Sequence, residues 1–350
     1  MELKVAVVGA TSQVGREILK TMAERDFPAA EVVALAAGRG SGQEVSYGEE
    51  RVLRVRGTES FDFADTDLVF MAAGEAASAA EVPRIAATGA MVIDLSGRFL
   101  GRPIALPVML APVGGLENFH PEGGAPAARA CGAAGVPIMV SSVSLPGLEG
   151  MAAATQGPKV FQLYVRGDRP WVDEIARSAI AEGYDAFCLT VDTAIYSRRE
   201  RDIAKRFVKP WRERATGQHF QAALNWDDVK RFKDTHAIPL ALKGIATAED
   251  AAMAVEHGVE VVYVSNHGGR QLDHGRGALD VLPEVVKAVD GKAKVWVDGG
   301  FSRGTDIVKA VAMGAELVGL GRLYCYALAA AGEAGVARMF DILKLSLIHI

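Results

Sequence analysis

The sequence predicts an α/β protein in which a TIM (β/α)8 barrel follows a partial, Rossmann-like dinucleotide-binding half-domain. Three observations support this fold class. The 350 residues are enough for about two domains at roughly 150 residues each. Short apolar runs alternate with helical patterns along the chain, which is typical of parallel sheets. From Gly101 onward the alternation yields eight strands, the number that closes such a barrel.

The first unit is predicted over residues 1–98. KVAVVGA is a β-branched run ending in glycine, Gly15–Arg25 has apolar residues at helical spacing, and VVALAA is strand-like again. These segments form a βαβ unit. DLVFMAA and MVIDLSG are two further apolar runs, separated by the helical stretch Ala76–Ala87, which we expect Pro83 to interrupt. This order of elements predicts a parallel sheet.

The second unit is predicted over residues 99–343. Its expected strands are PVMLAP, PIMVSS, KVFQLYV, AFCLTVDT, PLALKGI, VVYVSNHGG, KVWVDGG and LVGLGR. Polar residues gather where several of these apolar runs end, and they are Gln162, Tyr164, Thr190, Asp192, Lys243, Asn266, His267 and Asp298. Because barrel active sites are built at the C-terminal ends of the strands, the sequence predicts an active site there.

Composition excludes several classes of function. The formal net charge of -5 leaves no basic field for nucleic acid or an anionic membrane. The N-terminus has no signal-peptide pattern, and charges interrupt the most apolar later window, Val311–Ala330, so no membrane span is expected. Three widely spaced cysteines exclude a disulfide framework or a cysteine metal site and indicate a cytoplasmic protein. Residues 344–350 follow the last helix without a cap and are expected to be a non-native tail.

GATSQVG, Gly9–Gly15, lies between a predicted strand and a predicted helix, where backbone amides can approach a pyrophosphate. The same pattern also occurs in ordinary strand-to-helix turns. With LAAGRGSGQEV, DTDLVFMAAGEAAS and MVIDLSG, it resembles the N-terminal half of the NADP-binding domain of aspartate-semialdehyde dehydrogenase. The resemblance implies NADP contacts, including an arginine for the 2′-phosphate, from Gly9, Thr11, Val14, Gly15 and Arg39. Ala72 and Gly40 stand where that family usually has serines.

Residues 100–343 resemble the FMN-dependent α-hydroxy acid oxidases and dehydrogenases, the family of glycolate oxidase and lactate oxidase. The most specific motif is SNHGGRQLD, Ser265–Asp273, and FQLYV, LTVDT, SRRERD, LKGI, VDGGFSRGTD and GLGR accompany it in the family's order. The resemblance implies FMN as cofactor and a small L-2-hydroxy acid as substrate. It also implies a homo-oligomer, commonly a tetramer.

Oxidation of a 2-hydroxy acid requires a base, a hydride acceptor and cations that hold the substrate carboxylate. The resemblance assigns the base to His267 and its orientation to Asp192. It assigns the carboxylate to Arg199 and Arg270, whose guanidinium forks suit that group. Tyr164 is expected at the substrate hydroxyl, although an aromatic side chain at this position could also simply fill the barrel.

Lys243 is expected beside the flavin, where a fixed ammonium would stabilise developing negative charge. The alternative is a lysine whose head reaches solvent at the barrel rim. The other FMN contacts that the resemblance implies are Pro112, Val113, Gly114, Ser141, Gln162, Thr190, Ser265, Asp298, Gly299, Gly300, Arg303, Gly321 and Arg322. Ser302 replaces one of two arginines that the family often has, and Val143 replaces a tryptophan of many members.

Three functions stay open on this basis. The first is FMN-dependent oxidation of a 2-hydroxy acid, with the first unit as a passenger. The second is aspartate-semialdehyde dehydrogenase, which the absence of a cysteine in a matching context opposes. The third is a non-functional chimera joined near Arg98, where one resemblance stops and the other starts. No motif fixes which 2-hydroxy acid is used, or whether oxygen or a quinone accepts the electrons.

Overall fold

The computed structural model describes residues 3–49, 51–94, 97–195, 199–207 and 216–348. It divides into two compact units. The first comprises residues 1–107 with 343–350, and the second comprises residues 108–342. None of the helices in the described part of the chain is both long enough and apolar enough to cross a bilayer.

The first unit is built on a five-stranded sheet in the order β5-β2-β1-β6-β7, with all neighbours parallel. The strands of this sheet are β1 (Leu3–Val8), β2 (Ala29–Ala36), β5 (Arg56–Gly57), β6 (Leu68–Met71) and β7 (Met91–Asp94). The other elements are α1 (Gln13–Glu24), η1 (Gly38–Gly40), α2 (Glu75–Ala86) and two hairpins, β3–β4 (Glu44–Tyr47, Arg51–Arg54) and β8–β9 (Gly97–Phe99, Arg102–Ile104). The predicted parallel sheet is confirmed.

Strand β1 shows why the sheet is covered on both faces. Val5 and Val7 pack in one apolar cluster with α1, whereas Ala6 and Val8 pack in another that contains Ile85 of α2. This alternation follows from the two-residue period of a strand. The expected interruption at Pro83 is wrong, because α2 continues past it. Pro83 lies close to the helix end, where its missing N–H removes a single hydrogen bond.

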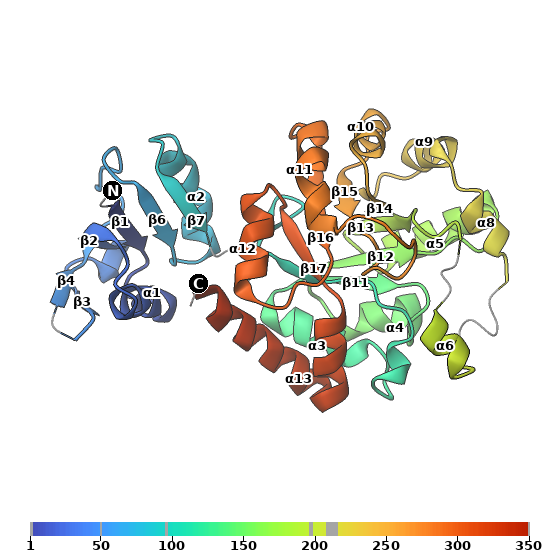
Figure 1. Ribbon diagram of the computed structural model, residues 1–350, viewed down its shortest axis with the longest axis horizontal. Helices are drawn as coiled ribbons and strands as arrows, with labels where there is room; N and C mark the ends of the chain where they lie inside the picture. The colour runs from blue at the N-terminus through green and yellow to red at the C-terminus, as the bar shows by residue number, and fades with distance from the viewer. Residues whose placement is uncertain (1–2, 50, 95–96, 196–198, 208–215, 349–350) are drawn as a thin grey trace. The chain divides into compact units, whose positions relative to one another are not determined.

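The second unit is a closed barrel of eight parallel strands (Figure 1). The strands are β10 (Val108–Leu110), β11 (Ile138–Ser141), β12 (Lys159–Leu163), β13 (Ala186–Thr190), β14 (Leu240–Ile245), β15 (Val261–Val264), β16 (Lys294–Asp298) and β17 (Leu317–Leu320). Each lies within one of the eight predicted runs, so the predicted barrel is confirmed. Strands β12 and β13 are buried along their whole length, as expected of parallel strands covered by helices.

Helices lie outside the barrel strands (Figure 1). They are α3 (Ala125–Ala134), α4 (Gly147–Ala154), α5 (Arg169–Ala181), α6 (Glu200–Ala204), α8 (Gln218–Ala222), α9 (Trp226–Thr235), α10 (Ala248–Glu256), α11 (Ala278–Val289), α12 (Gly304–Ala312) and α13 (Arg322–Ile348), with the short η2 (Leu116–Asn118). Helix α13 is kinked at Ala331 and Gly332, where Gly332 has a φ of 56°. Its last part continues through most of the segment predicted to be a tail.

Candidate active site

His267 lies just beyond the end of β15, in a turn whose left-handed backbone few residue types adopt without strain. Its φ is 58°, and those of Gly268 and Gly269 are 67° and 70°, so three successive residues are left-handed. Glycine adopts this conformation without strain, which explains the two glycines of the motif. The turn aims the imidazole back over the strand ends, where 18% of the side chain is exposed.

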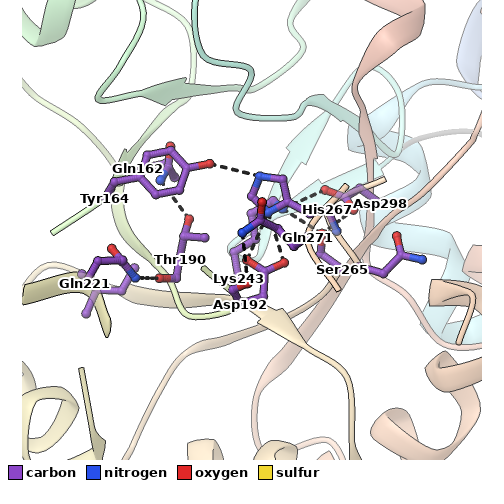
Figure 2. Close-up of polar contacts among 12 residues, drawn as sticks. Gln162, Tyr164, Thr190, Asp192, Gln221, Lys243, Ser265, His267, Gln271 and Asp298 are labelled. Carbon is purple, nitrogen blue, oxygen red and sulfur yellow. Dashed lines mark hydrogen bonds and ion pairs between the residues drawn. The ribbon is translucent and has the colours of Figure 1, made fainter. Parts of the chain in front are cut away.

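Two side chains bracket the imidazole of His267 (Figure 2). The Nδ1 atom lies 3.1 Å from both carboxylate oxygens of Asp192, and Nε2 lies 3.1 Å from the hydroxyl of Tyr164. Because a carboxylate only accepts hydrogen bonds, Nδ1 carries the proton of the neutral ring and Nε2 accepts. This arrangement leaves Nε2 as the basic atom of the site.

Lys243, Ser265 and Asp298 form a second, more deeply buried cluster beside the imidazole. The Nζ atom of Lys243 donates to Ser265 Oγ at 2.7 Å and lies 3.3 Å from Asp298 Oδ2. Ser265 Oγ donates to Asp298 Oδ1 at 2.6 Å and accepts the backbone N–H of His267 at 3.1 Å. The lysine side chain is only 4% exposed, so the alternative of a solvent-reaching lysine is wrong.

Burial and nearby carboxylates act in opposite directions on Lys243. Burial alone lowers the pKa of a lysine, but the carboxylates of Asp298 and Asp192 outweigh it and raise the pKa of Lys243. The side chain is therefore a fixed ammonium at neutral pH. It presents a permanent positive charge at the C-terminal end of the barrel.

Gln162 and Thr190 indicate that the site accepts a polar ring. Gln162 is fully buried, and its Nε2 donates to Thr190 Oγ1 at 2.8 Å, whereas its Oε1 has no hydrogen-bond partner. An unpaired buried oxygen costs about 1–3 kcal/mol, so a ligand N–H would be stabilised there. A flavin ring carries such a donor, and the residues present therefore fit FMN.

Glycines that follow β16 and β17 leave backbone N–H groups uncovered by side chains, and a phosphate binds to such groups. Gly299 and Gly300 have φ values of 132° and 83°, and a Cβ on Gly300 or Gly321 would meet no atom within 4 Å. The next residue, Arg322, begins α13. These glycines and Arg322 therefore lie just beyond β16 and β17, the usual phosphate position of this fold.

The remaining residues predicted in the FMN site also lie at strand ends. Pro112, Val113 and Gly114 follow β10, and Ser141 ends β11. A Cβ on Gly114 would lie 2.6 Å from a methyl carbon of Val143, so a larger residue there would have to displace the valine side chain. Arg303 precedes α12, where Asp306 accepts its backbone N–H at 2.9 Å.

The two predicted carboxylate-binding arginines lie on loops beyond the barrel strands β13 and β15. Arg199 immediately precedes α6, and its side chain is half-buried. Arg270 follows the left-handed turn and is exposed. The structure thus brings Tyr164, Asp192 and His267 into contact, and leaves both arginines on the surrounding loops.

In the first unit, the predicted NADP loop is packed tightly against the end of β6. Ser12 Oγ accepts the N–H of Gly15 at 2.9 Å and donates to the carbonyl of Ala72 at 3.0 Å. A Cβ on Gly9 would lie 2.5 Å from the Ala72 carbonyl carbon, and one on Gly15 would lie 2.2 Å from the Gly9 oxygen. Both glycines are therefore required by the fold itself.

The other predicted NADP residues lie around the same loop. The Oγ1 atom of Thr11 lies 3.2 Å from where a Cβ on Gly40 would stand, and Val14 packs against the core of the unit. The backbone of Arg39 belongs to η1, and its side chain lies outside the described part of the chain.

Two glutamines of the site were missing from the predicted residues. Gln271 donates from Nε2 to the carbonyl of Ile195 at 3.1 Å and is nearly buried. It belongs to SNHGGRQLD, so the motif could have indicated it. Gln221 contacts two strand ends, but it lies in FQAALNW, where nothing in the sequence distinguishes it from an ordinary helical residue.

The closed barrel, with a histidine–carboxylate pair and a buried lysine at the C-terminal ends of its strands, has the architecture of a barrel oxidoreductase. Residues 80–349 match the FMN-dependent dehydrogenase family, and the chain belongs to that family. Residues 4–140 match the NAD binding domain of semialdehyde dehydrogenase, so the two matches overlap over residues 80–140.

Similar proteins agree with this assignment. An L-lactate oxidase of Nostoc sp. is 40% identical over 279 residues, which cover 72% of this chain and 76% of the relative. A glycolate oxidase of Spinacia oleracea is 39% identical over 276 residues, covering 72% and 74% of the two chains. A crystal structure of mandelate oxidase with (S)-2-phenylpropionate has a TM-score of 0.68 at 39% identity, covering 73% of this chain and 75% of the other.

Proposed function

We propose that the barrel binds FMN and oxidises a small L-2-hydroxy acid to the 2-oxo acid. One observation carries the proposal: a histidine held between a carboxylate and a phenol lies beside a buried lysine ammonium, at the C-terminal ends of the strands. The similarity to oxidases of lactate, glycolate and mandelate supports the substrate class. It also disfavours the aspartate-semialdehyde dehydrogenase alternative.

His267 performs the proton transfer in this proposal. Its Nε2 takes the proton of the substrate hydroxyl as the C=O bond forms, and Asp192 stabilises the imidazolium that results. When bound, FMN would accept the Cα hydrogen of the substrate together with the two electrons of its bond to Cα. Tyr164, hydrogen-bonded to Nε2, contacts the same substrate oxygen.

Two arginines on loops, Arg199 and Arg270, orient the substrate. Arg199 and Arg270 hold the substrate carboxylate through their guanidinium groups, and this fixes the Cα hydrogen relative to the cofactor. Arg199 belongs to the loop after β13, whereas Arg270 lies three residues after His267 in the loop that follows β15, so one arginine shares its loop with the base.

The FMN site is divided between ring and phosphate. Lys243 and Gln162 contact the ring, while the glycine loops after β16 and β17, with Arg303 and Arg322, hold the phosphate. The other proposed contacts are those at the strand ends described above, from Pro112, Val113, Gly114, Ser141, Thr190, Ser265 and Asp298.

The full-length protein is expected to carry FMN when purified. Thermal or acid denaturation should release a yellow flavin, which chromatography against FMN and FAD standards identifies as FMN. A well-folded, colourless protein that fails to take up added FMN would overturn the proposed function.

For the first unit we propose weak NADP binding without turnover, because the tight Gly9–Gly15 loop is present while a half-domain lacks the far side of a dinucleotide crevice. Titration followed by NADPH fluorescence should show weak binding, and Arg39→Ala should reduce the preference for NADPH over NADH. No NADP-dependent oxidation of aspartate semialdehyde is expected. Such turnover in a protein truncated to residues 1–99 would contradict this assignment.

The proposed setting is the reducing cytoplasm. Cys131, Cys188 and Cys325 are all buried, and burial raises the pKa of the Cys131 thiol well above its usual range and that of the Cys188 thiol to about 12. Thiols of this kind stay protonated and unreactive. We also propose a homo-oligomeric assembly, on the basis of the family resemblance.

A further inference from the structure

Gln221, on the short helix α8, joins two barrel strands that carry parts of the active site. The residue is 2% exposed. Its Oε1 accepts the backbone N–H of Val165 at 2.7 Å, and its Nε2 donates to the backbone carbonyl of Thr190 at 2.7 Å. Both ends of one side-chain amide are therefore engaged, as Figure 2 shows for the contact with Thr190.

The side-chain amide of Gln221 connects β12 and β13 just beyond the point where their backbone pairing ends. The last paired residues of these strands are Leu163 and Leu189. Beyond this pair, Val165 and Thr190 are connected through Gln221 rather than to each other. The glutamine side chain thus continues the link between the strands at the point where backbone pairing stops.

The same two strand ends hold the side chains that contact His267. Tyr164 immediately precedes Val165, and Asp192 lies two residues after Thr190. The imidazole spans Tyr164 and Asp192 with contacts of 3.1 Å on each side. The imidazole and the Gln221 amide are therefore two bridges across one pair of strand ends.

We propose that Gln221 is a positioning residue that fixes the separation of Tyr164 and Asp192 around His267. This role rests on the proposed function, because it matters for proton transfer to Nε2. If the amide is removed, the Val165 N–H and the Thr190 carbonyl lose their partners and the strand ends move to regain them. A displacement of about 1 Å in such a site can slow a reaction by 10²-fold.

Gln221→Met is the first test, since methionine has a similar length and forms neither hydrogen bond. We expect FMN to remain bound, and the rate of flavin reduction by a 2-hydroxy acid to fall by about 10- to 100-fold. Reduction at the parent rate would overturn the proposal.

A second variant, Gln221→Glu, should affect flavin reduction to a degree that depends on pH. A protonated carboxyl group reproduces the amide, since its O–H donates to Thr190 and its carbonyl accepts from Val165, whereas a carboxylate cannot donate. Burial favours the protonated form. The reduction rate relative to the parent should therefore be close to one at low pH and fall toward the Gln221→Met value as pH rises. A ratio that does not change with pH would contradict the role.

Tyr184→Phe is the matched control for lost stability. It removes another buried hydrogen bond, from the Tyr184 hydroxyl to the Leu148 carbonyl at 2.8 Å, and Tyr184 precedes the opposite end of β13. Flavin reduction should be unchanged in this variant. A slowing equal to that of Gln221→Met would show that general destabilisation explains both.

A measurement on FMN-free protein separates failure of this role from failure of the proposed function. The ring ¹⁵N signals of His267, assigned by their loss in His267→Gln, should move in Gln221→Met and stay in place in Tyr184→Phe. If no 2-hydroxy acid reduces the parent flavin, the proposed function fails, while these signals still decide the positioning role. Unmoved signals in Gln221→Met would overturn it.

Discussion

His267→Gln is expected to slow anaerobic flavin reduction by a 2-hydroxy acid by about 10²- to 10⁴-fold, the usual contribution of a positioned general base. The glutamine has no basic atom to replace Nε2, which faces the Tyr164 hydroxyl at 3.1 Å. Stopped-flow recording of flavin absorbance against substrate concentration measures the rate constant and the apparent affinity together.

FMN should stay bound in His267→Gln, because Lys243 and the glycine loops do not depend on the imidazole. Apparent substrate affinity should change less than the rate constant, since the proposed carboxylate-binding residues are Arg199 and Arg270. If the variant reduces its flavin at the parent rate, His267 is not the base, whatever cofactor is bound.

Lys243→Met is expected to weaken FMN binding and to slow flavin reduction together. The variant removes the buried ammonium and leaves the Asp298 carboxylate, previously 3.3 Å from it, without a cation. Breaking a buried pair on one side typically costs about 3–5 kcal/mol, so thermal stability should fall as well. Fluorescence titration of the FMN-free protein measures the affinity, and calorimetry measures the stability.

The double variant Lys243→Met with Asp298→Asn separates the two effects. It removes both charges, so most of the lost thermal stability should return. Affinity for FMN and the rate of flavin reduction should remain low, because the ammonium itself is still missing. Recovery of all three properties would show that Lys243 serves only to balance Asp298.

The sequence predicted the barrel and much of its polar layer because both depend on local pattern. Each strand lies within one apolar run, and a polar residue one or two positions beyond the strand, such as Ser265 or Asp192, is carried to the same end of the barrel by strand register. The order of the family motifs then identified which polar residues meet. Contacts among Lys243, Ser265 and Asp298 follow from their place on neighbouring strands.

Other features depend on contacts that no local pattern encodes. Gln221 is connected to the site through two backbone groups, and a glutamine on a short helix carries no sign of such partners. The continuation of α2 for three residues past Pro83 is not encoded by the proline itself, which removes one helical hydrogen bond wherever it lies inside a helix. The positions of the Arg199 and Arg270 side chains depend on loop conformation, which strand periodicity does not determine.

The Ser265 hydroxyl has a consequence for attempts to re-engineer this enzyme. Its single hydrogen is committed to Asp298, while its lone pairs receive Lys243 and the backbone of His267. A library that alters the cofactor side of the pocket through Lys243 or Asp298 would therefore also disturb the backbone that carries the base. The free-energy effects of substitutions at these positions will not add, because the residues share one hydrogen-bonded group. Redox behaviour and proton transfer are therefore constrained to change together during evolution.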